Sequence, residues 1–285
     1  MTDATVSVGL VQIGGEPFDV QGNRVLADSS ATTAFERGAD IVVLPEMIIH
    51  GYVADANALW PIAESIDGPT VESWTKLAAK FDGYVVGGFC ERDGQALYNT
   101  AVAVGPDGLI LHYRKLHLFD NEKNAFQEGD LGLPVVATRF GKIGVCVCYD
   151  LRFVEVVRTL ALQGADLICV PTAWLPGFDQ ERWDEHGMCP QARGAVLQAN
   201  LSQVFIACAS QAGKHGNLDF LGSSCLADPY GRLASGPLSG SEDAIEVTEI
   251  DIGDSARSRV RAPLIAPRAD RRTDVYGIRY GERVL

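Results

Sequence analysis

The chain has 285 residues, of which 37 are acidic and 24 are basic, and its formal net charge is −13. Its lysines and arginines form no stripe, which excludes a nucleic-acid partner because phosphate backbones bind to clustered positive charge. No apolar stretch approaches the roughly 20 residues that span a bilayer, and the first residues lack the basic and apolar regions of a secretory signal. We therefore expect a cytoplasmic protein with no membrane partner.

Short apolar runs alternate with helical stretches along the chain. In order, the predicted elements are a strand at 6–13, a helix near 21–37, a strand at 41–44, a helix near 69–81, strands at 84–91, 99–105, 109–118 and 141–148, a helix near 152–163, a strand at 167–170, a helix near 190–202 and strands at 204–210 and 223–229. The sequences GPDG at 105–108 and DPYGR at 228–232 predict turns. Strands that alternate with helices indicate a layered α/β fold.

Two of these stretches look like each other. TTAFERGADIVVLPEM (32–47) and RTLALQGADLICVPTAW (158–174) each give a helix, then Gly-Ala-Asp, then an apolar strand, then Pro. Gly38 and Gly164 stand where a helix end favours a left-handed residue, and the continuous apolar runs predict strands covered on both faces. The duplication predicts two similar halves of one domain over residues 1–285. Its Arg- and Pro-rich tail, 254–285, is expected to pack on the surface or on a partner subunit.

Three reactive side chains lie at or near the ends of predicted strands. Glu46 follows the run IVVLP, Lys115 stands within LILHYRKLHL, and Cys148 closes the run IGVCV. Reactive groups of α/β sheets gather beyond the carboxyl ends of the strands. A thiolate there would attack a carbonyl carbon, a carboxylate would carry the proton and an ammonium would stabilise the oxyanion. Together the three residue types indicate acyl transfer.

The residues alone leave other interpretations of Cys148 open. It fits a buried filler, as Cys146 does, because free cysteine is among the most buried residue types. The seven scattered cysteines suit buried thiols rather than disulfides, and the Cys-x-Cys spacing with no second pair disfavours a zinc clip. A Cys–His pair with His117 or His186 is a further alternative, although neither histidine lies in a local signature. We expect no metal and no cofactor.

Three segments resemble the signature blocks of the nitrilase, or carbon–nitrogen hydrolase, superfamily. They are GADIVVLPEM, HYRKLHLFD and GVCVCYDLRF, in this order and spacing. The resemblance extends through YNTAVAVGPDG, FLGSSCLADPYG and RRTDVYG, and thus over nearly the whole chain. It implies a four-layer α-β-β-α sandwich with an internal pseudo-twofold axis, a small-molecule amide substrate and a homodimer or larger homo-oligomer.

The resemblance also implies roles for single residues. The family's catalytic glutamate, lysine and cysteine correspond to Glu46, Lys115 and Cys148, and its second glutamate to Glu122, with Glu128 as the weaker candidate. Tyr149 would supply a backbone N–H to the oxyanion. Trp174 stands where the family often places a residue that contacts the substrate, with Phe178 and Trp183 beside it.

The residues after the cysteine separate branches of the family. True nitrilases usually have Cys-Trp-Glu, whereas this chain has Cys-Tyr-Asp, which is similar to the amidase branches. N-carbamoyl-amino-acid hydrolases tend to carry adjacent arginines that hold a carboxylate; here Arg152 stands alone, and we expect it in a structural ion pair. The Arg-Ala-x-Glu-Asn run of many members is replaced by ARGAVLQANLSQ (192–203).

These features predict a hydrolase of small aliphatic amides that works through a cysteine thioester. An N-carbamoyl amine or amino-acid amidohydrolase is the alternative, and a nitrilase is a weaker one. Outside the enzymes, the alternative is an inactive member of the superfamily that serves as an interaction module.

Overall fold

The computed structural model describes residues 5–177 and 179–285. The first half comprises β1 (Thr5–Gln12), α1 (Val20–Glu36), β2 (Ile41–Val43), α2 (Ala56–Leu59), α3 (Pro69–Phe81), β3 (Tyr84–Asp93), β4 (Ala96–Gly105), β5 (Gly108–Arg114) and the 3₁₀ turn η1 (Asp120–Asn124). The second half comprises β6 (Val135–Thr138), β7 (Gly141–Val145), η2 (Cys148–Arg152), α4 (Val154–Leu162), β8 (Leu167–Thr172), α5 (Pro190–Ser202), β9 (Phe205–Ser210), β10 (Ala212–His215), β11 (Leu218–Leu221), β12 (Cys225–Ala227), β13 (Leu233–Ser235), β14 (Ala244–Asp251), α6 (Asp254–Arg257), β15 (Arg279–Tyr280) and β16 (Arg283–Val284).

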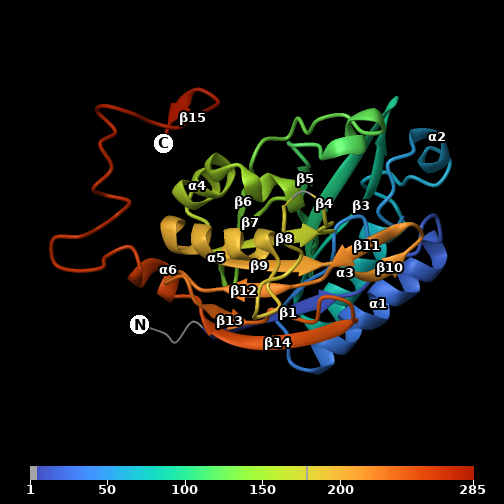
Figure 1. Cartoon of the computed structure of the whole chain (residues 1–285), viewed down its shortest axis with the longest axis horizontal. Helices are drawn as coiled ribbons and strands as arrows, with labels where there is room; N and C mark the ends of the chain where they lie inside the picture. Colours follow the sequence, from blue (N-terminus) through green and yellow to red (C-terminus); the bar gives the residue numbers. More distant parts are fainter. Residues whose placement is uncertain (1–4, 178) are drawn as a thin grey trace.

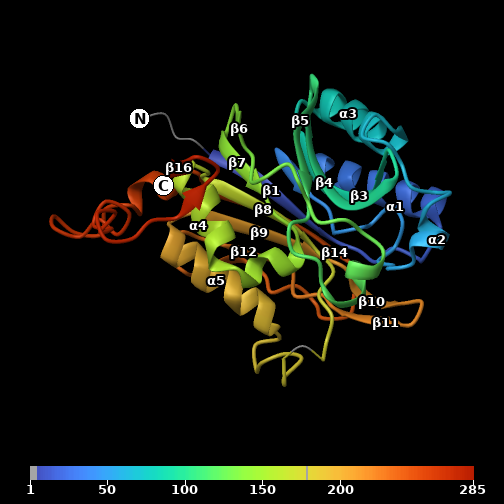
Figure 2. The ribbon, with the colours of Figure 1, turned by 90° about the horizontal axis from the view of Figure 1, so that it is seen from above.

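Two six-stranded sheets pack face to face between two layers of helices (Figures 1 and 2). Within β2, Ile41 and Val43 belong to the core between the sheets, whereas Val42 belongs to the core that holds Trp74 of α3. Successive side chains of a strand point to opposite faces, so a strand that is apolar on both faces is covered on both sides. The predicted four-layer α-β-β-α sandwich is confirmed.

The order of the strands repeats between the two sheets. One sheet has the order β14-β1-β2-β3-β4-β5, and the other, taken in the same sense, β6-β7-β8-β9-β12-β13. In each sheet the first strand runs antiparallel to the second, and the second, third and fourth strands run parallel to one another. The fifth strand is antiparallel to both the fourth and the sixth. Gly38 and Gly164 end the helices before β2 and β8 at φ angles of 93° and 100°. The duplication seen in the sequence is thus a duplication of the fold.

β5 and β7 end earlier than the sequence predicts, and each ends close to a candidate site residue. β5 ends at Arg114 rather than at 118, because the N–H of His117 donates to the side chain of Asp150 instead of to a neighbouring strand. β7 ends at Val145 rather than at 148, because the N–H of Val147 donates to the same carboxylate. The strands β6, β10, β11, β13 and β14, which the sequence analysis did not predict, complete the sheets and one small hairpin.

After α6 the chain leaves the body of the protein in a long loop and returns toward α4 (Figures 1 and 2). The Arg268 guanidinium donates to the carbonyls of Ala161, Ser202 and Gln203, at the ends of α4 and α5. The division into one domain and a tail that contacts a partner stays a prediction. Along residues 5–177 and 179–285, no helix combines the length and the apolar character needed to cross a membrane.

Candidate active site

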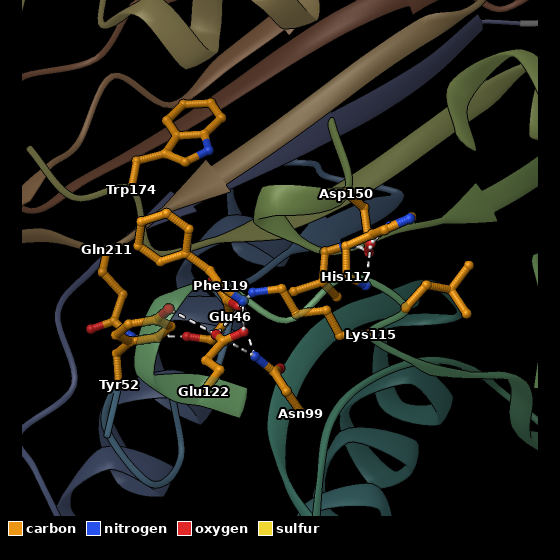
Figure 3. Close-up of polar contacts among 12 residues, drawn as sticks. Glu46, Tyr52, Asn99, Lys115, His117, Phe119, Glu122, Asp150, Trp174 and Gln211 are labelled. Atoms are coloured by element: carbon orange, nitrogen blue, oxygen red, sulfur yellow. Dashed lines mark hydrogen bonds and ion pairs between the residues drawn. The ribbon is translucent and has the colours of Figure 1, made fainter. Parts of the chain in front are cut away.

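Lys115 is the centre of a buried polar cluster. Its Nζ lies 2.7 Å from Glu46 Oε1 and 2.9 Å from Glu122 Oε1, and all three side chains are at most 2 % exposed. Asn99 Nδ2 donates to the same two oxygens, at 2.8 and 3.2 Å. Figure 3 shows these side chains converging from separate segments of the chain. The structure therefore brings together the two glutamates and the lysine that the sequence analysis singled out.

Glu46 is fixed through its backbone by both halves of the fold. It lies three residues beyond β2, and its N–H donates to the carbonyl of Thr172, the last residue of β8, at 3.3 Å. Its own carbonyl accepts from Gln211 Nε2 at 2.8 Å. Met47, the next residue, has a φ of 52°, a conformation that residues other than glycine seldom adopt. The carboxylate is thus held at the point where the ends of β2 and β8 meet.

The second carboxylate is Glu122 of η1. Its Oε2 accepts from the N–H of Phe119 at 2.8 Å, and its Oε1 accepts from the Tyr52 hydroxyl at 2.7 Å. Lys115 is the first residue after β5, and its N–H donates to the carbonyl of Asn99 at 2.8 Å. Glu128 is exposed to solvent. The geometry favours Glu122 over Glu128 as the partner of the lysine.

Cys148 begins η2 with a φ of 47°. Such left-handed geometry at a residue other than glycine is strained and is concentrated at functional sites. Burial raises the pKa of the Cys148 thiol well above its usual value; the charge of Glu46 raises it further, while Lys115 and a hydrogen bond from the Ala173 backbone lower it. The thiol is therefore neutral at rest and needs a base before it can attack.

Glu46 is suited to be that base. Burial raises the pKa of Glu46 to about 7, against the lowering effect of Lys115. Burial also lowers the pKa of Lys115, but the charges of Glu122 and Glu46 outweigh it, so the lysine pKa is raised and the side chain stays charged. A general base works best with a pKa near the operating pH. The cluster therefore combines a carboxylate, Glu46, that can gain and lose a proton near pH 7 with a lysine, Lys115, that stays charged.

A second network joins the lysine segment to the cysteine turn. Asp150 Oδ2 accepts from the Tyr113 hydroxyl at 2.6 Å and from the N–H of Val147 at 2.9 Å. Its Oδ1 is 2.8 Å from His117 Nδ1 and accepts from the N–H of His117 at 3.1 Å (Figure 3). Asp150 is fully buried. It connects the residues that follow Lys115 with the residue that precedes Cys148.

Cys148 lies in the wall of a cavity of about 270 Å³. Tyr149 and Trp174 line this cavity, as the sequence analysis predicts for residues near the substrate, and most of the other wall side chains are apolar. Phe178 lies outside the described residues. Trp183 is placed elsewhere: its indole N–H donates to the carbonyl of Leu221 at 2.8 Å.

Cys146, His117, His186 and Arg152 all lie in settings that explain them without a catalytic role. Cys146 is fully buried in the hydrophobic core, as expected for a filler. His117 is bound to Asp150 and stacks on Phe153 at 3.6 Å between ring centroids, and His186 is exposed beside Glu185, so neither histidine is placed to serve the cysteine. Arg152 lines the cavity of Cys148 and forms the expected ion pair, with Asp179 at 3.1 Å.

Three contributors to the site were not identified from the sequence. Asn99 and Tyr52 bind the glutamates, and Asp150 holds the cysteine turn. Asn99 had one detectable signal, since it is a polar residue at the start of the apolar run TAVAV. Tyr52 had none, because its contact with Glu122 spans 70 positions of the chain.

A duplicated α-β-β-α sandwich that holds a buried carboxylate–ammonium pair near a strained cysteine defines a class of protein, the hydrolases that cleave carbon–nitrogen bonds. The profile of the carbon–nitrogen hydrolase family matches residues 7–259, and this chain belongs to that family.

Known relatives agree with this assignment. A nitrilase from Pyrococcus abyssi is 36 % identical over 249 residues, which cover 87 % of this chain and 90 % of that protein. An omega-amidase from Xenopus laevis is 33 % identical over 257 residues, which cover 86 % of this chain and 87 % of that protein. A solved structure of an amidase variant from Nesterenkonia sp. AN1, with the acetamide moiety of fluoroacetamide added covalently to its active-site cysteine, is similar with a TM-score of 0.76 at 25 % identity and covers 96 % of this chain and 97 % of that one. The protein is a hydrolase that acts on amides.

Proposed function

We propose that this protein hydrolyses uncharged aliphatic amides to the carboxylic acid and ammonia, with Cys148 as nucleophile and a thioester as intermediate. The observation that carries the proposal is the buried cluster of Glu46, Lys115 and Glu122 near a strained cysteine in the wall of a largely apolar cavity. Covalent capture of an acetamide group by the cysteine of the Nesterenkonia amidase supports a small amide as substrate.

The first step is attack by the sulfur. Oε1 of Glu46 is occupied by Lys115 and Asn99, whereas its buried Oε2 has no hydrogen-bond partner among the described residues. That oxygen takes the proton of the Cys148 thiol while the sulfur bonds to the amide carbonyl carbon. An ammonium has three donors, and the carboxylates occupy two of those of Lys115. The third binds the oxyanion, together with the N–H of Tyr149.

Collapse of the tetrahedral intermediate releases the amine. The carbon–nitrogen bond breaks, the nitrogen takes the proton held by Glu46, and ammonia leaves a thioester on Cys148. A water molecule then gives a proton to Glu46 and attacks the thioester carbon. The carbon–sulfur bond breaks, the sulfur recovers the proton, and the acid leaves. Glu46 thus acts twice as base and twice as acid, the second time by returning the proton to the sulfur, which suits a pKa of about 7.

The charge of the cavity supports amides over N-carbamoyl amino acids. A carboxylate on the substrate needs a cationic partner. Arg152, the cationic side chain in this wall, is paired with Asp179 at 3.1 and 3.2 Å. The Cys-Tyr-Asp sequence supports the amidase branches over the nitrilases.

Mass spectrometry of protein quenched during turnover tests the mechanism. We expect an acyl adduct on the peptide that contains Cys148, and none in Cys148→Ala, whose fold is checked by circular dichroism. Ammonia release from amides, N-carbamoyl compounds and nitriles tests the substrate class. Turnover of nitriles alone, or substantial activity of Cys148→Ala, would refute the proposal, and a soluble protein with no turnover on any of the panel would favour an interaction module.

We also propose that two copies pair through the layer of α4 and α5. Leu201 of α5 lies outside the cavity of Cys148 and is 48 % exposed, and Val154 and Leu197, which also line that cavity, are 58 % and 60 % exposed. Such exposure is unusual for neighbouring large apolar side chains. Sedimentation analysis of the protein and of Leu201→Glu tests this. A dimer that the variant disrupts is the expected result, and a monomeric parent protein at micromolar concentration contradicts it.

A further inference from the structure

The helix α5 forms one wall of the cavity that contains Cys148. Gln191, Gly194, Leu197 and Gln198 of this helix line it. Residues three, four and seven positions apart lie on one face of a helix, so these residues form a continuous strip. The strip has a gap in its middle, because Gly194 has no side chain.

No contact among residues 5–177 and 179–285 accounts for a glycine at position 194. Gly194 lies inside the helix Pro190–Ser202, where glycine is less favourable than alanine. Its φ is not positive, and a Cβ atom at this position would meet no heavy atom of the described residues within 4 Å. By contrast, a Cβ at Gly88 would lie 2.9 Å from the N of Met47. Neither backbone geometry nor packing requires glycine at 194.

Gly194 differs from the other glycines whose surroundings leave room for a Cβ. Seven glycines of the described chain would accept a Cβ with no neighbour within 4 Å, and six of them have a positive φ that favours glycine. Gly194 is the exception. A side chain at position 194 would extend into the cavity of Cys148 or into the solvent at the mouth of that cavity. The glycine therefore leaves this part of the cavity open.

The volume of the cavity exceeds the needs of the smallest substrates. At the roughly 30 Å³ that liquid water occupies per molecule, the four heavy atoms of acetamide would need about 120 Å³. The cavity holds about 270 Å³. Its further wall residues include Leu151, Val154 and Leu175, which offer apolar contact to a chain of methylene groups.

We infer that Gly194 is a specificity-determining position, whose missing side chain opens the acyl subsite along α5 to straight-chain amides of about five or six carbons. The inference rests on the proposed amidase function and names its substrate class. Burial of one methylene group favours binding about fourfold. Hexanamide should therefore have a kcat/KM at least tenfold above that of acetamide.

Filling the gap tests the inference. Gly194→Leu should lower kcat/KM for hexanamide at least tenfold and leave acetamide within about twofold, with Gly194→Ala between the two. Alanine and leucine are strong helix formers, so the melting temperature of either variant should not fall. The matched control is Arg193→Leu, which adds the same side chain at the exposed neighbouring position outside this cavity and should leave the ratio of the two substrates unchanged.

A binding experiment separates failure of this inference from failure of the proposed function. Calorimetry on Cys148→Ala should show hexanamide binding at least tenfold more tightly than acetamide, and Cys148→Ala/Gly194→Leu should lose that preference. If the parent enzyme hydrolyses no amide, the proposed function fails while the binding result still decides the role of Gly194. Equal effects of Gly194→Leu on both amides, or no effect on either, would overturn the inference.

Discussion

Asp150 offers a strict test of how the site is assembled. Its two carboxylate oxygens accept four hydrogen bonds, from the Tyr113 hydroxyl, the N–H of Val147, and the N–H and ring of His117. Asparagine has nearly the same shape but replaces one acceptor with an NH₂ group. Whichever oxygen is replaced, a backbone N–H then faces another donor, so the asparagine cannot satisfy all four partners.

The cost of Asp150→Asn follows from these contacts. A hydrogen bond to a charged group contributes about 1.5–3 kcal/mol, and a buried donor left without an acceptor adds a penalty. The tyrosine hydroxyl can turn to accept from the new NH₂ group, which recovers part of the loss. We expect the free energy of unfolding to fall by about 3 kcal/mol, which for a chain of this size lowers the melting temperature by roughly 6–12 °C.

The effect on activity distinguishes positioning from stability alone. If Asp150 holds the cysteine turn, a shift of about 1 Å should reduce kcat/KM about 10²-fold at a temperature where the variant is fully folded. The rate at which iodoacetamide alkylates Cys148 should change as well. Asp179→Asn breaks the more exposed ion pair with Arg152 and serves as the control, with an effect of about 1 kcal/mol or less. A melting temperature within 2 °C of the parent and kcat/KM within threefold would refute the role of Asp150.

Other predictions address the buried carboxylates. The kcat/KM of the parent enzyme should fall about tenfold per pH unit below 7, because Glu46, whose pKa is raised to about 7, must be ionised to accept the thiol proton; a profile flat from pH 5 to 8 contradicts this. Glu122→Ala should lower kcat about 10²–10³-fold because the lysine loses a partner, whereas Glu128→Ala should stay within twofold; equal rates would remove Glu122 from the site. Glu91→Gln should reduce the free energy of unfolding by about 3 kcal/mol, because it leaves the buried charge of Arg114 without its main partner; chemical denaturation measures this, and a loss below 1 kcal/mol would count against it.

The duplicated halves could be predicted because their signals are local. A helix, a left-handed glycine and a short apolar strand each depend on a few adjacent residues, and Gly38 and Gly164 occupy the left-handed conformation that the sequence indicates. The strand β14 gave no comparable signal. Its residues AIEVTEID are mostly half-exposed, because β14 lies at the edge of its sheet, next to β1.

The residues of the site also fall into two groups, those that the sequence predicts and those that only the fold brings together. Glu46, Lys115 and Cys148 could be selected because each is a reactive residue at or near the end of an apolar run. Asn99 and Tyr52 were not selected, because their contacts with the glutamates span 23 to 70 positions of the chain. Asp150 was not selected because two of its partners, Tyr113 and His117, lie 37 and 33 positions away. The reactive groups are local in the sequence, whereas the groups that orient them are created by the fold.

The internal repeat explains why these groups meet where they do. When the two repeats are aligned on Gly-Ala-Asp and the following Pro, Glu46 of one half corresponds to Thr172 of the other. The structure places these equivalent residues in contact, since the N–H of Glu46 donates to the carbonyl of Thr172. The ends of the equivalent strands β2 and β8 thus adjoin at the centre of the sandwich, beside the buried polar cluster of Glu46 and Lys115. One half contributes the carboxylate and the lysine and the other contributes the cysteine, so neither half alone holds a complete site.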